Sequence, residues 1–209
     1  MGKYTGSVCR LCRREGEKLF LKGARCYTHR CAVDRRRYAP GQHGALKRGK
    51  LSNFGIQLRE KQKLKRIYGL YERQFKNYFI KSTQKKGVTG EVLLQFLERR
   101  LDNVIYQLGF AASRNQARQI VGHNFVYVNN GRVNIPSYLV ETDDEISLRF
   151  VKTGQKTVEQ NLETNKERAV PSWLEIDTKA FKAKVKRLPE RDDIAFPINE
   201  QLIVELYSR

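Results

Sequence analysis

The first strong pattern in the chain is helical and covers residues 89–109. Apolar residues recur there at intervals of three and four, the spacing of one face of an amphipathic helix. They are Leu93, Leu97, Leu101, Val104, Ile105 and Leu108. Thr89 is a suitable N-cap and Gly109 suits the position after the C-cap, so one helix is predicted over the whole stretch.

A second helix is predicted to begin at Ser113. Ser113 and Gln116 have the spacing of a capping box, in which each residue satisfies a free backbone N–H group at the helix start. Arg114 and Arg118 lie one turn apart, so they are expected to form a basic face near this helix N-terminus, a position suited to phosphate.

After Gly122 the apolar period changes from 3.6 to 2. This alternation predicts strands at 125–128, 132–135 and 145–151. The first two strands are separated by Asn-Asn-Gly, in which Asn130-Gly131 can adopt the positive φ angles of a tight turn.

Two further helices are predicted ahead of this region. Ser52 can cap a helix that runs to about residue 68, and a second helix follows Gly69. The aromatic residues of the second helix have helical spacing, and we interpret them as core rather than as a platform for nucleic-acid bases. They are Tyr71, Phe75, Tyr78 and Phe79. Helix and loop both fit residues 152–169, while helix and strand both fit residues 202–207.

The charge of the chain is concentrated in its first half. The net charge is +19, and residues 1–100 hold 26 Lys and Arg against 7 Asp and Glu, whereas residues 101–209 hold 15 of each. This asymmetry predicts a polyanionic partner that is bound mainly by the first half.

The four cysteines form one cluster near the N-terminus. They are Cys9, Cys12, Cys26 and Cys31, two close pairs joined by a short loop. This spacing favours a tetrahedral zinc ion held by four thiolates, a structural site with no position left for a reactive water. The alternatives are free or oxidised thiols, including two disulfides, and an iron–sulfur cluster. His29 is a weaker candidate ligand, since four cysteines already complete the shell.

Arginines surround the cysteines and continue into a loop that contains proline and glycine. Those beside the cysteines would offset the negative charge of a thiolate centre, and the loop lets a phosphate backbone approach closely. Arginines beside the cysteines are Arg10, Arg13, Arg14, Arg25 and Arg30. The candidate RNA-binding residues are Arg13, Arg14, Arg35, Arg36, Arg37, Gln42, His43, Lys47, Arg48, Lys50, Arg59, Lys63, Arg66, Arg114 and Arg118. His43 has no carboxylate or nucleophile near it in the sequence, so hydrogen bonding is favoured over acid–base catalysis.

Several of these segments carry a resemblance to a known family. R-L-D-N-V-I-Y (100–106), G-F-A-A-S-R-N-Q-A-R-Q (109–119) and P-S-Y (136–138) resemble the RNA-binding module of the S-four family. The remainder of the chain is similar to the bacterial, cysteine-bearing ribosomal members of that family. The similar segments are C-R-L-C-R-R-E-G (9–16), A-P-G-Q-H-G (39–44), L-R-E-K-Q-K-L-K-R-I-Y-G (58–69), E-R-Q-F (72–75) and N-E-Q-L-I-V-E-L-Y-S-R (199–209).

The resemblance implies an α+β fold. A helical N-terminal domain would carry a zinc-knuckle-like extension, and the inserted RNA-binding module would pack two helices on a small, mostly antiparallel sheet. The implied divisions are a cysteine-cluster extension with a basic loop (1–45), a helical domain (46–90 with 180–209) and the module (91–179).

The resemblance also implies a function. The chain would be a structural constituent of the small ribosomal subunit, and a primary binder of the 5′ domain of small-subunit ribosomal RNA that nucleates assembly and contributes to translational accuracy. Small-subunit ribosomal protein five would be a partner, with messenger RNA near the path by which it enters the subunit. No homo-oligomer is required.

The sequence also resembles two other function classes in part. Pseudouridine synthases join this module to a catalytic domain, and Arg100-Leu101-Asp102 invites that comparison, but no separate catalytic domain is left in this chain. A zinc-dependent DNA regulator would need a recognition helix directly after the cysteines, where proline and glycine occur instead. No segment approaches the roughly 20 apolar residues of a membrane span, and the start lacks a secretion signal. We therefore expect a cytosolic chain, with an organellar ribosome left open.

Overall fold

The computed structural model describes residues 2, 4–46, 50–150, 152–165, 168–194 and 196–208. The chain divides into two compact units, which are described separately below. The first unit, called the helical unit, consists of residues 1–93 and 196–209. The second, called the sheet unit, consists of residues 94–195.

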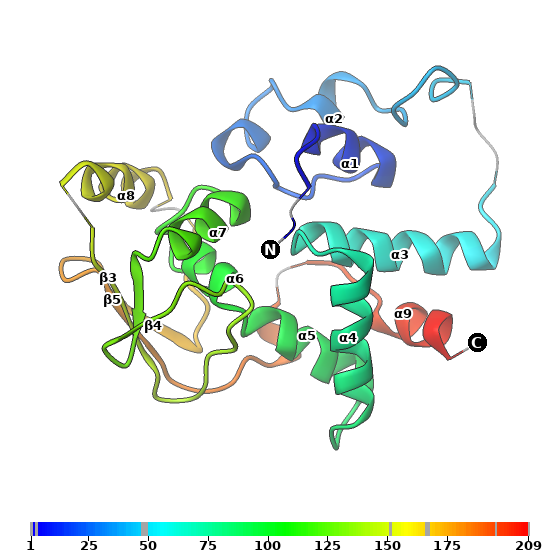
Figure 1. Cartoon of the computed structure of the whole chain (residues 1–209). Helices are drawn as coiled ribbons and strands as arrows, with labels where there is room; N and C mark the ends of the chain where they lie inside the picture. The colour runs from blue at the N-terminus through cyan, green and yellow to red at the C-terminus, as the bar shows by residue number, and fades with distance from the viewer. Residues whose placement is uncertain are drawn as a thin grey trace. The chain divides into compact units, whose positions relative to one another are not determined.

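The helical unit contains only helices and connecting segments among its described residues. Its helices are α1 (Val8–Glu15), η1 (Gly23–Cys26), α2 (Ala32–Arg35), α3 (Asn53–Ile67), α4 (Glu72–Thr83), the first half of α5 (Thr89–Glu98) and α9 (Glu200–Tyr207). The predicted cap of α3 is confirmed, since Ser52 Oγ accepts a hydrogen bond from the Gly55 N–H at 3.2 Å. In Figure 1 the end of the chain, α9, lies alongside α3 and α4.

The C-terminal segment is a helix, which decides between the two alternatives that its sequence allows. Asn199 caps α9 by accepting hydrogen bonds from the backbone N–H groups of Gln201 and Leu202. Ile203 is fully buried, and Gln57 Nε2 of α3 donates to Glu205 Oε2 at 2.9 Å. The helix is therefore stabilised by its packing on α3, a contact between residues far apart in the sequence.

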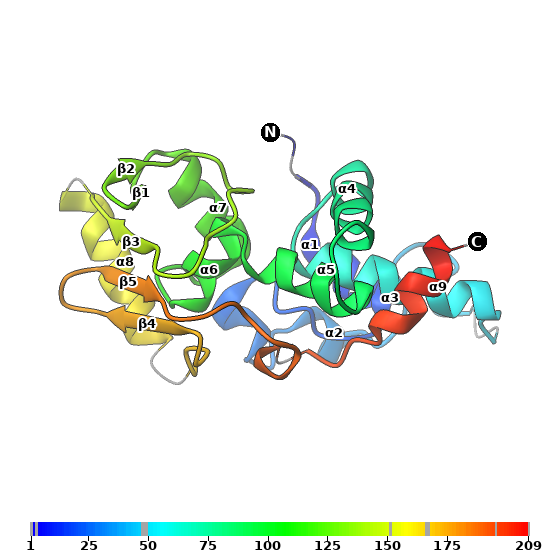
Figure 2. The same cartoon turned by 90° about the horizontal axis from the view of Figure 1, so that it is seen from below.

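The sheet unit is built on five antiparallel strands. Their order is β2-β1-β3-β5-β4, and β3, β5 and β4 lie side by side in Figure 2. The strands are β1 (Val126–Val128), β2 (Gly131–Arg132), β3 (Glu145–Leu148), β4 (Leu174–Asp177) and β5 (Lys182–Val185). The predicted α+β class with a mostly antiparallel sheet is confirmed. Strands β4 and β5 were not predicted from the sequence. Residues 182–185 are Lys-Ala-Lys-Val, and their lysines belong to a longer basic stretch that hides the alternation of a strand.

Among the described residues, three α-helices and the second half of α5 also belong to this unit. They are α6 (Leu101–Gln107), α7 (Arg114–Gly122) and α8 (Lys152–Thr164), followed by a short η2 (Arg191–Asp193). Trp173, Phe110 and Val126 are fully buried in the core that the sheet shares with α6 and α7. Residues 152–164 are helical, so the helix alternative for this segment is confirmed. No helix among the described residues has the length and apolar content to cross a membrane.

The prediction of one helix over residues 89–109 is wrong. The stretch forms α5 and α6, and Arg100 between them is extended, with φ −64° and ψ 133°. Arg100 forms a β-bridge with Leu139, and the Leu101 N–H donates to the Tyr138 carbonyl at 2.9 Å. A distant segment therefore takes the backbone hydrogen bonds that would have continued the helix.

The turn between β1 and β2 also differs from the prediction. Positive φ angles occur at Asn129 (48°) and Asn130 (65°), whereas Gly131 pairs with Val128 as the first residue of β2. Asparagine tolerates this backbone region better than most residues, so the two asparagines form the tight turn themselves.

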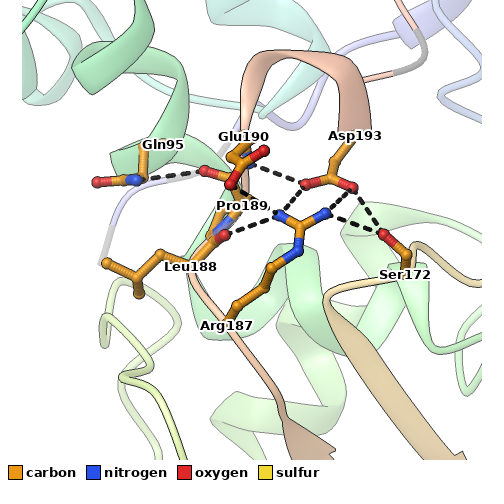
Figure 3. Close-up of polar contacts among 7 residues, drawn as sticks. All are labelled: Gln95, Ser172, Arg187, Leu188, Pro189, Glu190 and Asp193. Atoms are coloured by element: carbon orange, nitrogen blue, oxygen red, sulfur yellow. Dashed lines mark hydrogen bonds and ion pairs between the residues drawn. The ribbon is translucent and has the colours of Figure 1, made fainter.

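A polar cluster fastens the segment that follows β5 (Figure 3). Arg187 forms a bidentate ion pair with Asp193, with Nη1 2.7 Å from Oδ2 and Nη2 2.9 Å from Oδ1. Ser172 Oγ accepts from Arg187 Nη2 and donates to Asp193 Oδ1. Gln95 Nε2 of α5 donates to the Pro189 carbonyl at 3.2 Å. The segment that follows β5 is thus held to α5.

Candidate nucleic-acid interface

The four cysteines lie in one neighbourhood, on and between α1, η1 and α2. All four are free thiols; Cys12, Cys26 and Cys31 are buried, and Cys9 is half-buried. Burial raises the pKa of the Cys12 and Cys26 thiols, and the neighbouring cysteines, when ionised, raise both further. The backbone N–H of Lys22 donates to Cys26 Sγ at 3.4 Å.

Among the described residues, no group of three or more His, Cys, Asp or Glu side chains is positioned to hold a metal ion. His29, the weaker candidate ligand, is exposed. A zinc ion or an iron–sulfur cluster at this site therefore stays a prediction.

Three of the predicted RNA-binding arginines line a pocket next to Cys9. The pocket has a volume of about 180 Å³, and the three arginines are Arg13, Arg35 and Arg36. Arg10, Arg25 and Arg30 line it as well. From the sequence, these three are expected only to offset the charge of the cysteine cluster. Arg10, Arg25 and Arg30 are each adjacent in the sequence to a cysteine of one of the two pairs. This adjacency was the signal that they would lie close to the other arginines of the pocket.

Most of the remaining predicted residues of the N-terminal segment are exposed. Arg14, Arg37, Gln42, His43 and Lys50 all have exposed side chains. Arg13 is held closer to the protein, since its Nε donates to the Tyr38 carbonyl at 3.1 Å and its guanidinium lies 4.8 Å from the Tyr38 ring centre. The predicted residues Lys47 and Arg48 lie outside the described part of the chain.

The basic residues of α3 contact acidic residues rather than facing solvent alone. Arg59 and Arg66 both form ion pairs with Glu15 of α1, whose side chain is only 2% exposed. Burial raises the pKa of the Glu15 carboxyl, and the positive charges of Arg66 and Arg59 act in the opposite direction. These two arginines therefore join α3 to α1.

Lys63 of α3 is held in a similar way. Its Nζ lies 2.8 Å from Glu17 Oε2 and donates to the Pro197 carbonyl at 2.7 Å. The side chain connects α3 both to the segment after α1 and to the segment before α9, so its contribution to the fold is clear. Any RNA contact by Arg59, Lys63 or Arg66 stays a prediction.

Arg114 and Arg118 of α7 are buried, each with 9% of its surface exposed. Arg114 Nε donates to Asn103 Oδ1 at 2.8 Å, and its guanidinium lies 4.4 Å from the centre of the Tyr106 ring. Arg118 Nη1 lies 3.7 Å from Asp102 Oδ2. The structure therefore uses both arginines to pack α7 on α6, and their contact with phosphate stays a prediction.

Asp102, which invited the comparison with an RNA-modifying enzyme, is bound by arginine. Arg100 donates from Nε to Oδ1 at 3.0 Å and from Nη2 to Oδ2 at 2.6 Å, and both residues are buried. A carboxylate that accepts two charge-assisted hydrogen bonds in the interior has a clear structural role.

Comparison with known proteins covers both units. Residues 3–98 match the family model described as ribosomal protein S4/S9 N-terminal domain, and residues 99–146 match the S4 domain. Similar full-length proteins are small ribosomal subunit protein uS4 of Thermodesulfovibrio yellowstonii (58% identical) and of Thermus thermophilus (55% identical), each covering 100% of both chains. The protein thus falls in the class of ribosomal proteins, which are structural and not enzymes. The chain belongs to the ribosomal protein S4 family.

Proposed function

We propose that this chain is a structural constituent of the small ribosomal subunit, where it binds the ribosomal RNA chiefly through phosphate contacts made by the helical unit. One observation carries the proposal: all of the excess positive charge lies in residues 1–100 of a chain whose relatives are small-subunit proteins. Double-stranded RNA hides its base edges in a deep, narrow groove, so such a protein reads shape, phosphates and 2′-hydroxyls.

The exposed residues of the N-terminal segment are proposed to contact RNA first. Arg35, Arg36, Arg37, Gln42 and His43 have no acidic partner to displace among the described residues, so phosphates reach them without loss of an ion pair. The arginines and lysine of α3, and the two arginines of α7, would have to share or exchange their present partners. The exposed residues of the N-terminal segment are thus the first candidates among the fifteen RNA-binding residues that the sequence predicts.

The partners proposed for this chain follow from the family. They are the 5′ domain of small-subunit ribosomal RNA, where early binding would nucleate assembly, and small-subunit ribosomal protein five, through which the chain would influence accuracy. Messenger RNA near the path by which it enters the subunit is a further proposed contact.

Cys9, Cys12, Cys26 and Cys31 are proposed to hold a zinc ion. The support is their common neighbourhood, the N–H···S hydrogen bond to Cys26 and the arginines nearby, which would offset the charge of four thiolates. Binding would require the side chains to turn toward a common centre. The ion would tie α1 to η1 and α2, and it would supply stability rather than reactivity.

The metal proposal is tested by elemental analysis of protein purified under reducing conditions. One zinc per chain is expected, lost in Cys12→Ser and kept in His29→Ala. Iron with sulfide would assign the iron–sulfur alternative instead. Absence of both elements from the wild-type protein would refute a metal centre.

RNA binding is tested by footprinting on small-subunit ribosomal RNA together with a salt titration. Protection confined to a junction in the 5′ domain is expected, and neutralising ~8–12 phosphates predicts a log–log salt slope of about −6 to −11. A random transcript of equal length is the control. Equal, weak binding to both transcripts would contradict the proposal.

A further inference from the structure

Six arginines converge on the pocket beside Cys9. They come from three separate segments: α1, the stretch around η1, and α2 with the residue after it. The six are Arg10, Arg13, Arg25, Arg30, Arg35 and Arg36, and the remaining lining residues are Ser7, Cys9 and Ala32. None of the described carboxylates lines the pocket.

The positive charge of this pocket is not compensated by the protein. Within the described part of the chain, none of the six arginines forms an ion pair with a carboxylate. The hydrogen bonds of Arg13 and Arg25 go to backbone carbonyls. The acids nearest in sequence are engaged elsewhere, Glu15 by two arginines of α3 and Asp34 by Lys18.

This arrangement contrasts with several basic residues elsewhere in the chain. Arg100 and Arg187 are paired with aspartates, and Lys61 and Lys65 share Glu72. Five of the six arginines are exposed, but like charges gathered around one pocket still repel one another, and an anion placed among them removes that repulsion. The pocket is therefore built for a negatively charged ligand.

The size and geometry of the pocket indicate which anion fits. Its volume of about 180 Å³ is below the ~300–1,000 Å³ of pockets that enclose whole small molecules, so it suits a charged group rather than a complete nucleotide. Guanidinium presents a planar fork that matches phosphate oxygens in pairs. Ser7, the N-cap of α1, makes no side-chain capping hydrogen bond, and its carbonyl accepts a hydrogen bond from the Arg10 N–H at 3.1 Å.

We propose that this pocket is a phosphate-binding subsite that takes one or two adjacent phosphates protruding from a turn of an RNA strand. The inference rests on the proposed function for the RNA as the source of the phosphate. A concave basic pocket receives a protruding phosphate better than it receives the smooth flank of a regular helix. Free phosphate or pyrophosphate carries the same oxyanion chemistry, and the experiment distinguishes the two sources.

The test compares two variants of equal charge. The pocket variant is Arg10→Gln with Arg36→Gln, and the control variant is Arg73→Gln with Lys76→Gln on the exposed face of α4. None of these four side chains forms an ion pair in the described part of the chain, so both variants are expected to fold. Circular dichroism and thermal unfolding verify this for each.

Phosphate-ethylation interference on the small-subunit transcript reads out the site. With wild-type protein, ethylation at a limited set of phosphates should block binding. The pocket variant should lose interference at one or two of them, bind at least tenfold more weakly, and show a salt slope shallower by about 1 to 2. The control variant should keep the whole interference pattern.

A pyrophosphate arm identifies the source of the phosphate. Pyrophosphate is compared with chloride at matched ionic strength, with thermal unfolding of the RNA-free protein as readout. A rise in unfolding temperature in the wild type and control but not in the pocket variant supports a site open to free phosphate. Lost interference without such a rise supports a site selective for RNA phosphate.

The proposal is overturned if both variants keep the wild-type interference pattern and pyrophosphate acts on all three proteins alike. The proposal also fails if the two variants weaken RNA binding equally and neither changes the interference pattern. The pocket would then contribute only general positive charge, like any other basic surface. If the wild-type protein fails to prefer the ribosomal transcript, the proposed function fails. In that case the pyrophosphate arm alone decides whether the pocket binds phosphate.

Discussion

Tyr207 of α9 donates its phenolic hydrogen to Glu72 Oε1 of α4 over 3.0 Å. Lys61 and Lys65 of α3 contact the same carboxylate at 2.5 and 2.8 Å, and the Tyr207 ring lies 4.5 Å from that of Phe79. One acidic side chain thus joins three helices of the helical unit, including the last helix of the chain.

This cluster predicts an acid-sensitive contribution to stability. Partial burial raises the pKa of Glu72, but hydrogen bonds from Lys61, Lys65 and Tyr207 outweigh it and lower the pKa to about 2. The folded-state pKa lies below the ordinary value of 4.5, so the stabilisation is complete above pH 4.5 and is lost as the pH falls towards 2.

Urea unfolding of wild type and Glu72→Gln between pH 7 and pH 2.5 measures this contribution. The difference in unfolding free energy should be on the order of 1 kcal/mol or less at neutral pH, because the carboxylate is half exposed, and should shrink on acidification. A difference that grows as the pH falls would contradict the assignment.

Arg66 and Arg37 are predicted to separate stability from RNA binding. Arg66→Gln removes a partner of the buried Glu15 carboxylate and should lower the free energy of unfolding by about 1–3 kcal/mol. Arg37→Gln changes an exposed side chain, so stability should stay within about 0.5 kcal/mol while RNA binding weakens. Chemical unfolding and filter binding check the two. Unchanged stability in Arg66→Gln would show that its ion pair contributes nothing.

The buried pair Arg100–Asp102 is predicted to be essential to the sheet unit. Asp102→Ala leaves the guanidinium of Arg100 without its closest carboxylate in the interior and should cost about 3–5 kcal/mol. Asp143→Ala is the matched control, because its pair with Lys184 is exposed, and it should cost less than about 1 kcal/mol. Equal losses measured by urea unfolding would contradict the burial argument.

Phe110 is predicted to be a main core residue of the same unit. Its side chain is fully buried, and Phe110→Ala should lower the free energy of unfolding by about 3–5 kcal/mol. Trp173, the only tryptophan of the chain, is buried in the same core and reports the transition by fluorescence. Ile135→Ala, at a residue that is 52% exposed, should stay within about 0.5 kcal/mol. A similar loss of unfolding free energy in both variants would contradict the assignment of Phe110 to the core.

Patterns that act within one turn of helix or between neighbouring residues were readable from the sequence. Ser52 caps α3 as predicted, and the alternation at 125–128 gives β1, which begins one residue later than predicted. The charge of the first half and the spacing of the cysteines also needed no structure to be seen, since both are properties of composition and order. The α+β class and the family were predicted from a resemblance, which is carried by motifs such as those at residues 9–16, 39–44, 100–106 and 109–119.

Tertiary contacts decided where a helix ends, which face of α7 is buried and which arginines come together, none of which the local patterns predicted correctly. Leu139 and Tyr138 end the helix at Arg100, and Asn103, Tyr106 and Asp102 turn the expected basic face of α7 into a buried contact. The six arginines of the phosphate pocket meet only because three short segments fold together around the cysteines. Helix caps and periods depend on residues a few positions apart, whereas burial and charge pairing depend on partners from distant parts of the chain. The sequence by itself therefore determined several of the elements and the family resemblance, and the tertiary structure decided which cations form ion pairs and which have no carboxylate partner among the described residues.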